Sequence, residues 1–262
     1  MTAELSGRCT PGAAVQSLGA GRWRLSIPAG EAGRYRLAQL DDYCCLRRRA
    51  FPWRPPLRLA LRARASHAAL PGTWGFGLWN DPFSANLGLG GMARRLPTLP
   101  NAAWFFSASP PNYLAVHDEH PAQGFLAATF AAPAVPGPIL ALAAPALPLL
   151  AWPTAARGLR RLARRLVGED AAALSLDPTA WHAYALEWQA DGVRFEVDGA
   201  VALETAQVPR APLGLVLWID NQYAAFPPQG TLRFGTLANP EPAWLELAEI
   251  EVSLFANVNP GR

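Results

Sequence analysis

The sequence has no lysine, little net charge and few cysteines, and each shortage excludes a class of protein. All 23 basic residues are arginine, and they nearly balance 20 acidic residues, which leaves a formal net charge of +3. A charge this small does not indicate nucleic-acid binding, so we expect no nucleic-acid partner. The three cysteines lack zinc-binding spacing and no glycine-rich phosphate loop is present, so we expect free thiols, no metal and no cofactor.

No targeting or membrane-spanning segment is visible in the sequence. Residues 1–15 lack the basic start and apolar core of a secretory signal, which favours a cytoplasmic protein. No Asp, Glu, Lys or Arg occurs between Glu119 and Arg157. The most apolar part of that region, 131–153, carries six prolines, too many for a helix that crosses a membrane.

What the sequence does contain is a series of short alternating segments. Of its 262 residues, 51% are hydrophobic, enough to bury a large core. Residues 57–65 alternate apolar residues with arginine, which predicts a strand with its leucines on a buried face. Asp191-Gly192 joins two further alternating segments and predicts a hairpin turn. Strands separated by proline and glycine turns predict an all-β protein, which we expect to be one domain spanning residues 1–262.

The last predicted strand, within residues 244–255, has carboxylates at both parities. Glu249 and Glu251 share the parity of the leucines before them, and Glu246 has the opposite parity. Because successive side chains of a strand point to opposite faces, we expect these carboxylates to be split between two faces.

One segment departs from this pattern, and we treat residues 131–170 as an apolar, partly helical insertion. Its second part, 154–170, reads TAARGLRRLARRLVGED, which predicts a short basic amphipathic helix. Three roles stay open for the insertion: packing on the sandwich with solvated arginines, a lid over an apolar ligand, or a foot (131–168) on an anionic membrane surface. The expected helix has an apolar stripe and a basic remainder, formed by Leu159, Leu162, Ala163 and Leu166 and by Arg157, Arg161, Arg164 and Arg165.

The most specific block of the sequence is residues 181–199, WHAYALEW followed by QA and DGVRFEVDG. It is similar to a strand pair of the family sixteen glycoside hydrolases, in the concanavalin A-like lectin/glucanase superfamily. The resemblance covers residues 55–256 with gaps, and it implies a jelly-roll sandwich of two curved antiparallel sheets whose concave face forms a ligand cleft. Further stretches in the family's order are LRARA at 61–65, GTWGFGLW at 72–79, and residues 212–220 and 247–255.

The family's catalytic carboxylates have no counterpart in this sequence. Hydrolases of the family carry Glu-x-Asp-x-x-Glu on the strand after the equivalent of 72–79, where two carboxylates act as nucleophile and acid/base. Here the equivalent stretch falls within 101–116, NAAWFFSASPPNYLAV, which contains no Asp or Glu. We therefore expect no glycosidase activity of that type, and we expect an aromatic, neutral cleft floor.

Two strand ends finish alike, in Trp79-Asn80-Asp81 and in Trp218-Ile219-Asp220-Asn221. Residues i and i+2 of a strand share a face, so each tryptophan is paired with an aspartate. The resemblance implies that Trp218 lies on the concave sheet. Tryptophan with nearby Asp, Asn or Gln is the usual chemistry for holding a sugar ring, although such carboxylates also cap local backbone. The candidate ligand-binding residues are Trp79, Asn80, Asp81, Trp104, Trp218, Asp220, Asn221, Gln222 and Tyr223.

The densest titratable cluster is the run HDEH at residues 117–120. It follows a predicted strand and precedes Pro121, which indicates a loop. Two histidines three residues apart suit a metal only if the loop wraps into a turn, and no third ligand is spaced for one. A solvated polar turn is the alternative. The candidates for acid/base catalysis are Asp81, Asp220, His117, Asp118, Glu119 and His120.

Three functions remain open. The first is a non-hydrolytic domain that binds a glycan or similar polar ligand in the concave cleft. The second is an enzyme of a non-glycosidase type that acts on a hydrophobic small molecule under the 131–170 insertion. The third is a peripheral membrane or partner-binding protein. The sequence leaves the ligand and the oligomeric state unspecified.

Overall fold

The chain forms two seven-stranded antiparallel sheets that pack against each other. The computed structural model describes residues 4–82, 95–142, 145, 151–230 and 232–254. Sheet A has the strand order β1 (Ser6–Cys9), β4 (Leu37–Asp41), β13 (Gly214–Asp220), β6 (Thr73–Trp79), β7 (Ala102–Ala108), β8 (Gly124–Ala131), β9 (Gly168–Ala173). Sheet B has the order β12 (Ala200–Thr205), β11 (Val193–Val197), β10 (His182–Trp188), β5 (Leu57–Ala65), β16 (Ala243–Leu254), β3 (Arg22–Ile27), β2 (Ala14–Gly19).

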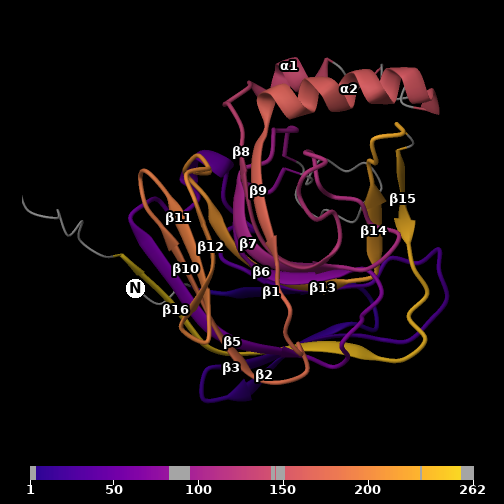
Figure 1. The fold of residues 1–262 in the computed structure, drawn as a ribbon. Coiled ribbons are helices and arrows are strands. Elements are labelled where there is room, and N and C mark those ends of the chain that lie inside the picture. The colour runs from indigo at the N-terminus through magenta and orange to yellow at the C-terminus, as the bar shows by residue number, and fades with distance from the viewer. Residues whose placement is uncertain (1–3, 83–94, 143–144, 146–150, 231, 255–262) are drawn as a thin grey trace, which may run out of the picture.

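The remaining elements lie on the side of sheet A that faces away from sheet B. Figure 1 shows sheet A curving upward, so that its outer face is concave, with two helices above it. None of the helices in the described residues is long and apolar enough to cross a membrane. These elements are a 3-10 turn (Arg48–Ala50), α1 (Gly137–Ala141), α2 (Pro153–Leu166) and a hairpin of β14 (Gln222–Ala225) and β15 (Arg233–Thr236).

The core lies between the two sheets and is formed by alternate residues of each strand. On β5, Leu57, Leu59 and Leu61 are almost completely buried, whereas Arg58 and Arg62 point to the outside. This confirms the strand and the buried face that the alternation predicts. The partly helical insertion is confirmed as well, since α1 and α2 lie between β8 and β9.

The closing strand β16 departs from the alternation expected of it. Glu249 has a positive φ of 54°, and the pairing with β5 shifts between Ala248 and Glu251, which is a β-bulge. The extra residue reverses the parity, so Val252 enters the core while Glu251 stays outside, on the same face as Glu246. The expectation that these carboxylates are split between faces is therefore wrong.

Candidate functional site

Three tryptophans come together on the concave face of sheet A, and we call them the indole cluster. Trp79 ends β6, Trp104 lies on β7, Trp218 lies on β13, and all three are half-buried. The rings of Trp79 and Trp218 are nearly parallel, with an interplanar angle of 6° and centroids 6.5 Å apart. The Trp104 ring lies 5.9 Å from that of Trp79 and 5.5 Å from that of Trp218. The three rings offer one continuous aromatic surface.

Glycines of β6 make room for these rings. Gly75 and Gly77 share the concave face with Trp79, and the strand register sets Gly75 beside Trp218 and Gly77 beside Trp104. A Cβ atom on Gly77 would lie 2.5 Å from the Cα of Trp104, well inside van der Waals contact. The alternation of glycine and large residues in GTWGFGLW therefore places the core on one side of the strand and the indole cluster on the other.

A polar network holds Trp79 from the side of β4. The indole Nε1 donates to the hydroxyl of Tyr43 at 2.6 Å, and the Gln39 amide donates to the same hydroxyl at 3.2 Å. Gln39 also donates to Asp41 at 2.8 Å, and Asp41 forms an ion pair with Arg8 at 2.5 Å. Burial raises the pKa of the Tyr43 hydroxyl well above its ordinary value, so the phenol stays protonated at neutral pH.

A second network holds Trp218 and includes Asp220. The indole Nε1 of Trp218 donates to the Thr73 hydroxyl at 2.9 Å, and this hydroxyl donates to Asp220 Oδ1 at 2.8 Å. Tyr35 donates to the other carboxylate oxygen at 3.3 Å. Burial raises the pKa of Asp220 to about 6, although these hydrogen bonds oppose the shift. Asp220 therefore positions Trp218 through Thr73.

Trp104 is the member of the cluster whose indole N–H has no partner among the described residues. Its Nε1 atom is buried and makes no hydrogen bond to any described residue. Trp74 and Trp188 have the same property, but both lie in the core between the sheets. Trp104 lies on the concave face, next to Trp79 and Trp218. The Trp104 N–H is therefore a covered donor of the indole cluster, and the cluster offers its aromatic faces more than this N–H.

We expect Asp220 to make stability depend on pH between about 4 and 6. Its folded pKa of about 6 lies above its ordinary value of 3.8, so protonation favours the folded chain. The stabilisation is complete below about pH 4 and is lost as the pH rises through 6. Lowering the pH from 7 to 5 should add ~1 kcal/mol to the free energy of unfolding through this group. Asp220→Asn should lack that gain.

Urea unfolding at pH 7, 6 and 5 measures the effect as a difference between the wild type and the variant. Asp42 has a pKa raised to about 6 by burial too, so part of the wild-type gain will remain in Asp220→Asn. Asp191→Asn, in the exposed β10–β11 turn, serves as a control that should follow the wild type. If the free energy of unfolding depends on pH equally in the wild type and in Asp220→Asn, Asp220 is not the source of the effect.

The structure separates Asp81 from Asp220. The strands β6 and β13 are antiparallel neighbours, with Trp79 opposite Gly214 and Asp220 opposite Thr73. Six residues therefore separate the two ends, on the order of 20 Å along the strands. Two strands that finish alike end at opposite edges when they are antiparallel, so the two aspartates do not line one groove.

Asp81 and Asn80 hold the chain that leaves β6. Asp81 is buried, has a φ of 50° and forms an ion pair with Arg95, which also donates to the carbonyl oxygen of Tyr43. The Asn80 side chain donates to the carbonyl oxygen of Leu99 at 2.9 Å and accepts from a backbone amide at 3.0 Å. The polar side chains of this strand end already have protein partners.

The residues after Asp220 also form mainly internal contacts. Asn221 is completely buried, and its side chain bonds the backbone of Arg34, Arg36 and Leu237 at 2.7 to 3.0 Å. Gln222 and Tyr223 begin β14 and are half-buried. Of the predicted ligand-binding residues, the tryptophans are thus the ones that the structure brings together.

The HDEH run at 117–120 forms a loop that anchors α2. Asp118 accepts hydrogen bonds from Arg160 at 2.5 Å and Arg164 at 2.7 Å, and the Arg160 bond holds its pKa below the ordinary value. The described residues contain no group of three or more side chains able to hold a metal ion. The other members of the run contact the same helix or its flank: His117 with the Val167 carbonyl, Glu119 with Arg164, and His120 with Asp170.

Arg160 is a buried residue of α2, whereas the other arginines of this helix are exposed. The residue is 3% exposed, and its guanidinium donates to the carbonyl oxygens of Ala115 at 2.9 Å and Phe226 at 2.5 Å. It also lies 5.3 Å from the ring of Tyr113. The helix thus packs through Ala156 and Arg160, and its leucines are left outside.

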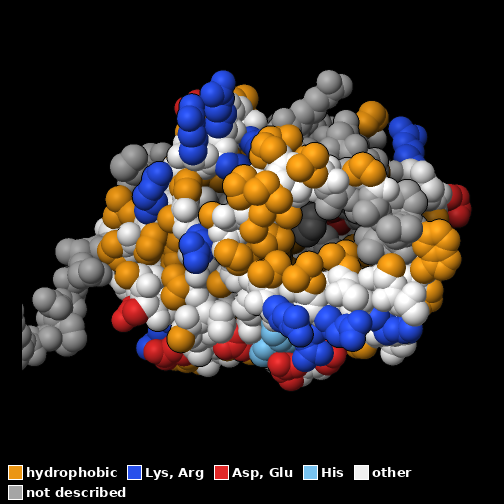
Figure 2. Space-filling view, turned by 90° about the horizontal axis from the view of Figure 1, so that it is seen from above, with side chains coloured by type: hydrophobic (Ala, Val, Ile, Leu, Met, Phe, Trp, Pro, Cys, Tyr) orange, Lys and Arg blue, Asp and Glu red, His pale blue; other side chains and the backbone are white. Residues whose placement is uncertain are grey.

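The helices present an exposed hydrophobic surface, which we call the apolar patch. Figure 2, viewed from the helix side, shows hydrophobic side chains gathered around a hollow and a row of arginines beside them. A hydrophobic surface at the mouth of a hollow is typical of a ligand entrance or of a docking surface. The patch consists of Ile139, Leu142, Trp152, Leu159, Leu162 and Leu166, which are 37 to 81% exposed.

The sequence matches no family model and no curated protein, but its fold matches solved structures. A family 16 endo-glucanase from Bacteroides ovatus aligns with a TM-score of 0.50 at 7% identity, over 95% of this chain and 94% of that one. The two chains share a jelly-roll sandwich of two antiparallel sheets. The all-β jelly roll that the sequence predicts is thereby confirmed.

Two further solved structures are similar at lower scores. A Bacillus licheniformis β-glucanase gives a TM-score of 0.45 at 12% identity, over 95% of this chain and 91% of that one. A glycoside hydrolase family protein from Mycobacterium thermorestibile gives 0.47 at 13% identity, over 90% and 77%. At identities this low the likeness concerns the fold alone.

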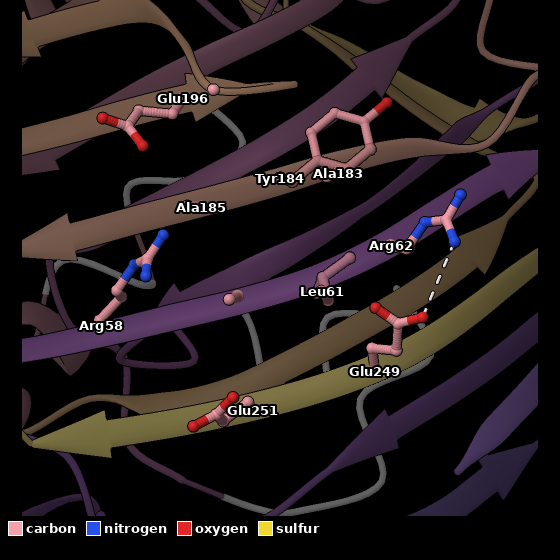
Figure 3. Close-up of a pocket in the computed structure, with 11 residues that line it drawn as sticks. Arg58, Leu61, Arg62, Ala183, Tyr184, Ala185, Glu196, Glu249 and Glu251 are labelled. Atoms are coloured by element: carbon pink, nitrogen blue, oxygen red, sulfur yellow. Dashed lines mark ion pairs between the residues drawn. The ribbon is translucent and has the colours of Figure 1, made fainter. Parts of the chain in front are cut away.

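The sandwich has a second hollow on the outer face of sheet B, shown in Figure 3. Its volume is about 250 Å³. Arg62 and Glu249 pair across it at 3.7 Å, and Arg58 pairs with Glu187 at 3.5 Å. These charges are largely exposed and paired, which is typical of a solvated ladder on a sheet surface. The concave face therefore remains the better candidate site.

Proposed function

We propose that this chain binds a glycan ring on the indole cluster and does not hydrolyse it. The observation that carries the proposal is the continuous surface of Trp79, Trp104 and Trp218 on the concave face. Flat aromatic faces take the apolar face of a sugar, while a few fixed polar groups set its orientation. The indole cluster supplies the aromatic part of such a site. The likeness to a solved endo-glucanase makes β-glucans the first ligands to test.

The lack of acidic residues on β7 and the separation of Asp41 from Asp220 support the non-hydrolytic part of the proposal. A retaining glycosidase needs two carboxyl groups about 5 Å apart, and an inverting one about 6.5 to 9.5 Å. The residues of β7 that face the cleft alternate from Ala102 to Ala108 without an acid. Asp41 pairs with Val216, four residues from Asp220, so these two carboxylates lie roughly 13 Å apart along the sheet.

Native affinity electrophoresis with barley β-glucan and laminarin tests the proposal. The wild type should be retarded, and Trp104→Ala and Trp218→Ala should each weaken binding about tenfold, as expected of central aromatic contacts. Trp104→Phe keeps an aromatic ring but loses the N–H, so it should weaken binding less. Trp181→Ala, on the side of sheet B, is the matched control and should bind as the wild type.

Two outcomes would contradict the proposal. Release of reducing ends from either glucan would show hydrolysis. Binding that is equal in the wild type, Trp104→Ala and Trp218→Ala would remove the indole cluster from the site. Circular dichroism of each variant separates loss of binding from loss of folding.

A second ligand class is favoured by the part of the concave face under α2. Phe106, Leu126 and Phe130 are buried there, and Val167 packs on them. This packed apolar cluster, together with the apolar patch beside the hollow of Figure 2, suits a hydrophobic small molecule. Fluorescence of a bound parinaric acid probe tests this class. Binding of that probe together with no retardation by either glucan would favour the hydrophobic ligand over the glycan.

A further inference from the structure

We propose that the apolar patch and the arginines beside it dock on an anionic lipid bilayer. The proposal concerns the outer surface of α1 and α2, and it holds whether or not the indole cluster binds a glycan. Large hydrophobic residues that are exposed together on one face of a folded chain mark a contact surface. An anionic membrane is the occupant that also accounts for the charges on the same helix.

The hydrophobic part of the surface is strongly exposed. Leu159, Leu162 and Leu166 follow one side of α2 and are 40%, 50% and 37% exposed. Trp152, just before the helix, is 59% exposed, and tryptophan is favoured at the boundary between lipid and water. Leu142, just after α1, is 81% exposed. A surface of this kind can enter the headgroup region without crossing the bilayer.

The charges complement an anionic surface. α2 contains no acidic residue, and Arg157, Arg161 and Arg165 are exposed on it. Arg161 and Arg165 form no ion pair with any described residue, whereas Arg164 is neutralised by Asp118. Figure 2 shows the row of arginines next to the hydrophobic surface, as in an amphipathic helix that lies in a membrane interface.

The anchoring of α2 fixes which side of the helix is presented. Arg160 and Ala156 bind the helix to the body of the protein, so the leucines point away from it. The helix is already ordered before any contact with lipid. The entropy of forming it is therefore not lost at the membrane, unlike in a disordered segment that folds on binding.

Sedimentation of the full chain with lipid vesicles tests the proposal. Phosphatidylcholine vesicles with about a third phosphatidylserine should bind the wild type at low salt, and pure phosphatidylcholine vesicles should bind it much less. The double variant Leu162→Ser with Arg161→Glu should lower the partition coefficient at least ~tenfold. Raising the salt concentration should weaken wild-type binding, since surface charges are screened.

A matched control makes the same two substitutions elsewhere. Leu18 and Arg22 are exposed at the β2–β3 hairpin of sheet B, far from the helices in Figure 1. Leu18→Ser with Arg22→Glu should bind vesicles as the wild type. Equal partitioning of both double variants and the wild type would overturn the proposal.

Self-association is the competing occupant of the patch. Sedimentation velocity without lipid would reveal a dimer that Leu162→Ser dissociates, and such a dimer with no vesicle binding would also overturn the proposal. A lack of vesicle binding would not change the retardation by glucans that is expected of the indole cluster. The two proposals can therefore be tested independently. Each variant should keep the wild-type circular dichroism spectrum, because the substituted side chains are exposed.

Discussion

Replacing Arg160 with methionine should release α2 from the concave side of the sandwich. The variant loses the ion pair with Asp118 and leaves the carbonyl oxygens of Ala115 and Phe226 without a donor in a buried place. Each buried acceptor left without its donor costs about 1 to 3 kcal/mol, so the two carbonyl oxygens together should cost about 3 kcal/mol. Because the contacts join one helix to the body of the chain, this loss should appear first as local opening of α2.

Hydrogen exchange followed by mass spectrometry measures that opening. Amides of α2 and of residues 113–118 should lose roughly a hundredfold of protection, the equivalent of about 3 kcal/mol. Arg161→Met changes an exposed arginine on the same helix and should shift protection little. If the amides of α2 exchange at the same rate in both variants, Arg160 does not anchor the helix. Another contact would then have to fix the orientation of the leucines.

The sandwich itself could be predicted from the sequence because its strands carry the alternation in full. On β5 every second residue from Leu57 is buried, and the Asp191-Gly192 turn joins β10 to β11 in antiparallel pairing. The resemblance around 181–199 added the two-sheet topology. In these stretches the local sequence pattern agrees with the final environment of each side chain, so the strands can be predicted from the sequence alone.

The pattern failed where the environment of a side chain depends on distant residues. α2 reads as a helix with a leucine stripe and a basic face, yet Arg160 is buried because Asp118 and two carbonyl oxygens meet it there. Glu251 lies on the same face as Glu246 because of a bulge that alternation does not show. Neither contact leaves a signal in the sequence near it.

The candidate site was predicted in part. Trp79, Trp104 and Trp218 were all proposed from the sequence, and the structure places them together, while their role in binding stays a proposal. The partners that hold them, Tyr43 and Thr73, were missed, since neither lies near a motif. One sequence pattern could have indicated the cluster. In GTWGFGLW, glycine occupies the alternate positions 75 and 77, which leaves space on that face for large side chains of the neighbouring strands.

Replacing Gly77 with alanine should be the most damaging small substitution in the cleft. The added Cβ would lie 2.5 Å from the carbonyl oxygen of Ala103 and from the Cα of Trp104, and both belong to the neighbouring backbone. Gly77 also has a φ of 157°, where L-residues are strained. Overpacking and strain together should cost about 3 kcal/mol or more of the free energy of unfolding.

Urea unfolding compares Gly77→Ala with Gly158→Ala, a matched control in α2 where a Cβ meets nothing within 4 Å. The control should be neutral or more stable by about 0.5 to 1 kcal/mol, because alanine favours helix. Near-ultraviolet circular dichroism should report disturbed packing of the indoles in Gly77→Ala alone. If Gly77→Ala instead costs less than about 1 kcal/mol, β6 and β7 can separate easily. The aromatic surface would then not depend on glycine, and larger residues at position 77 should also leave the cleft intact.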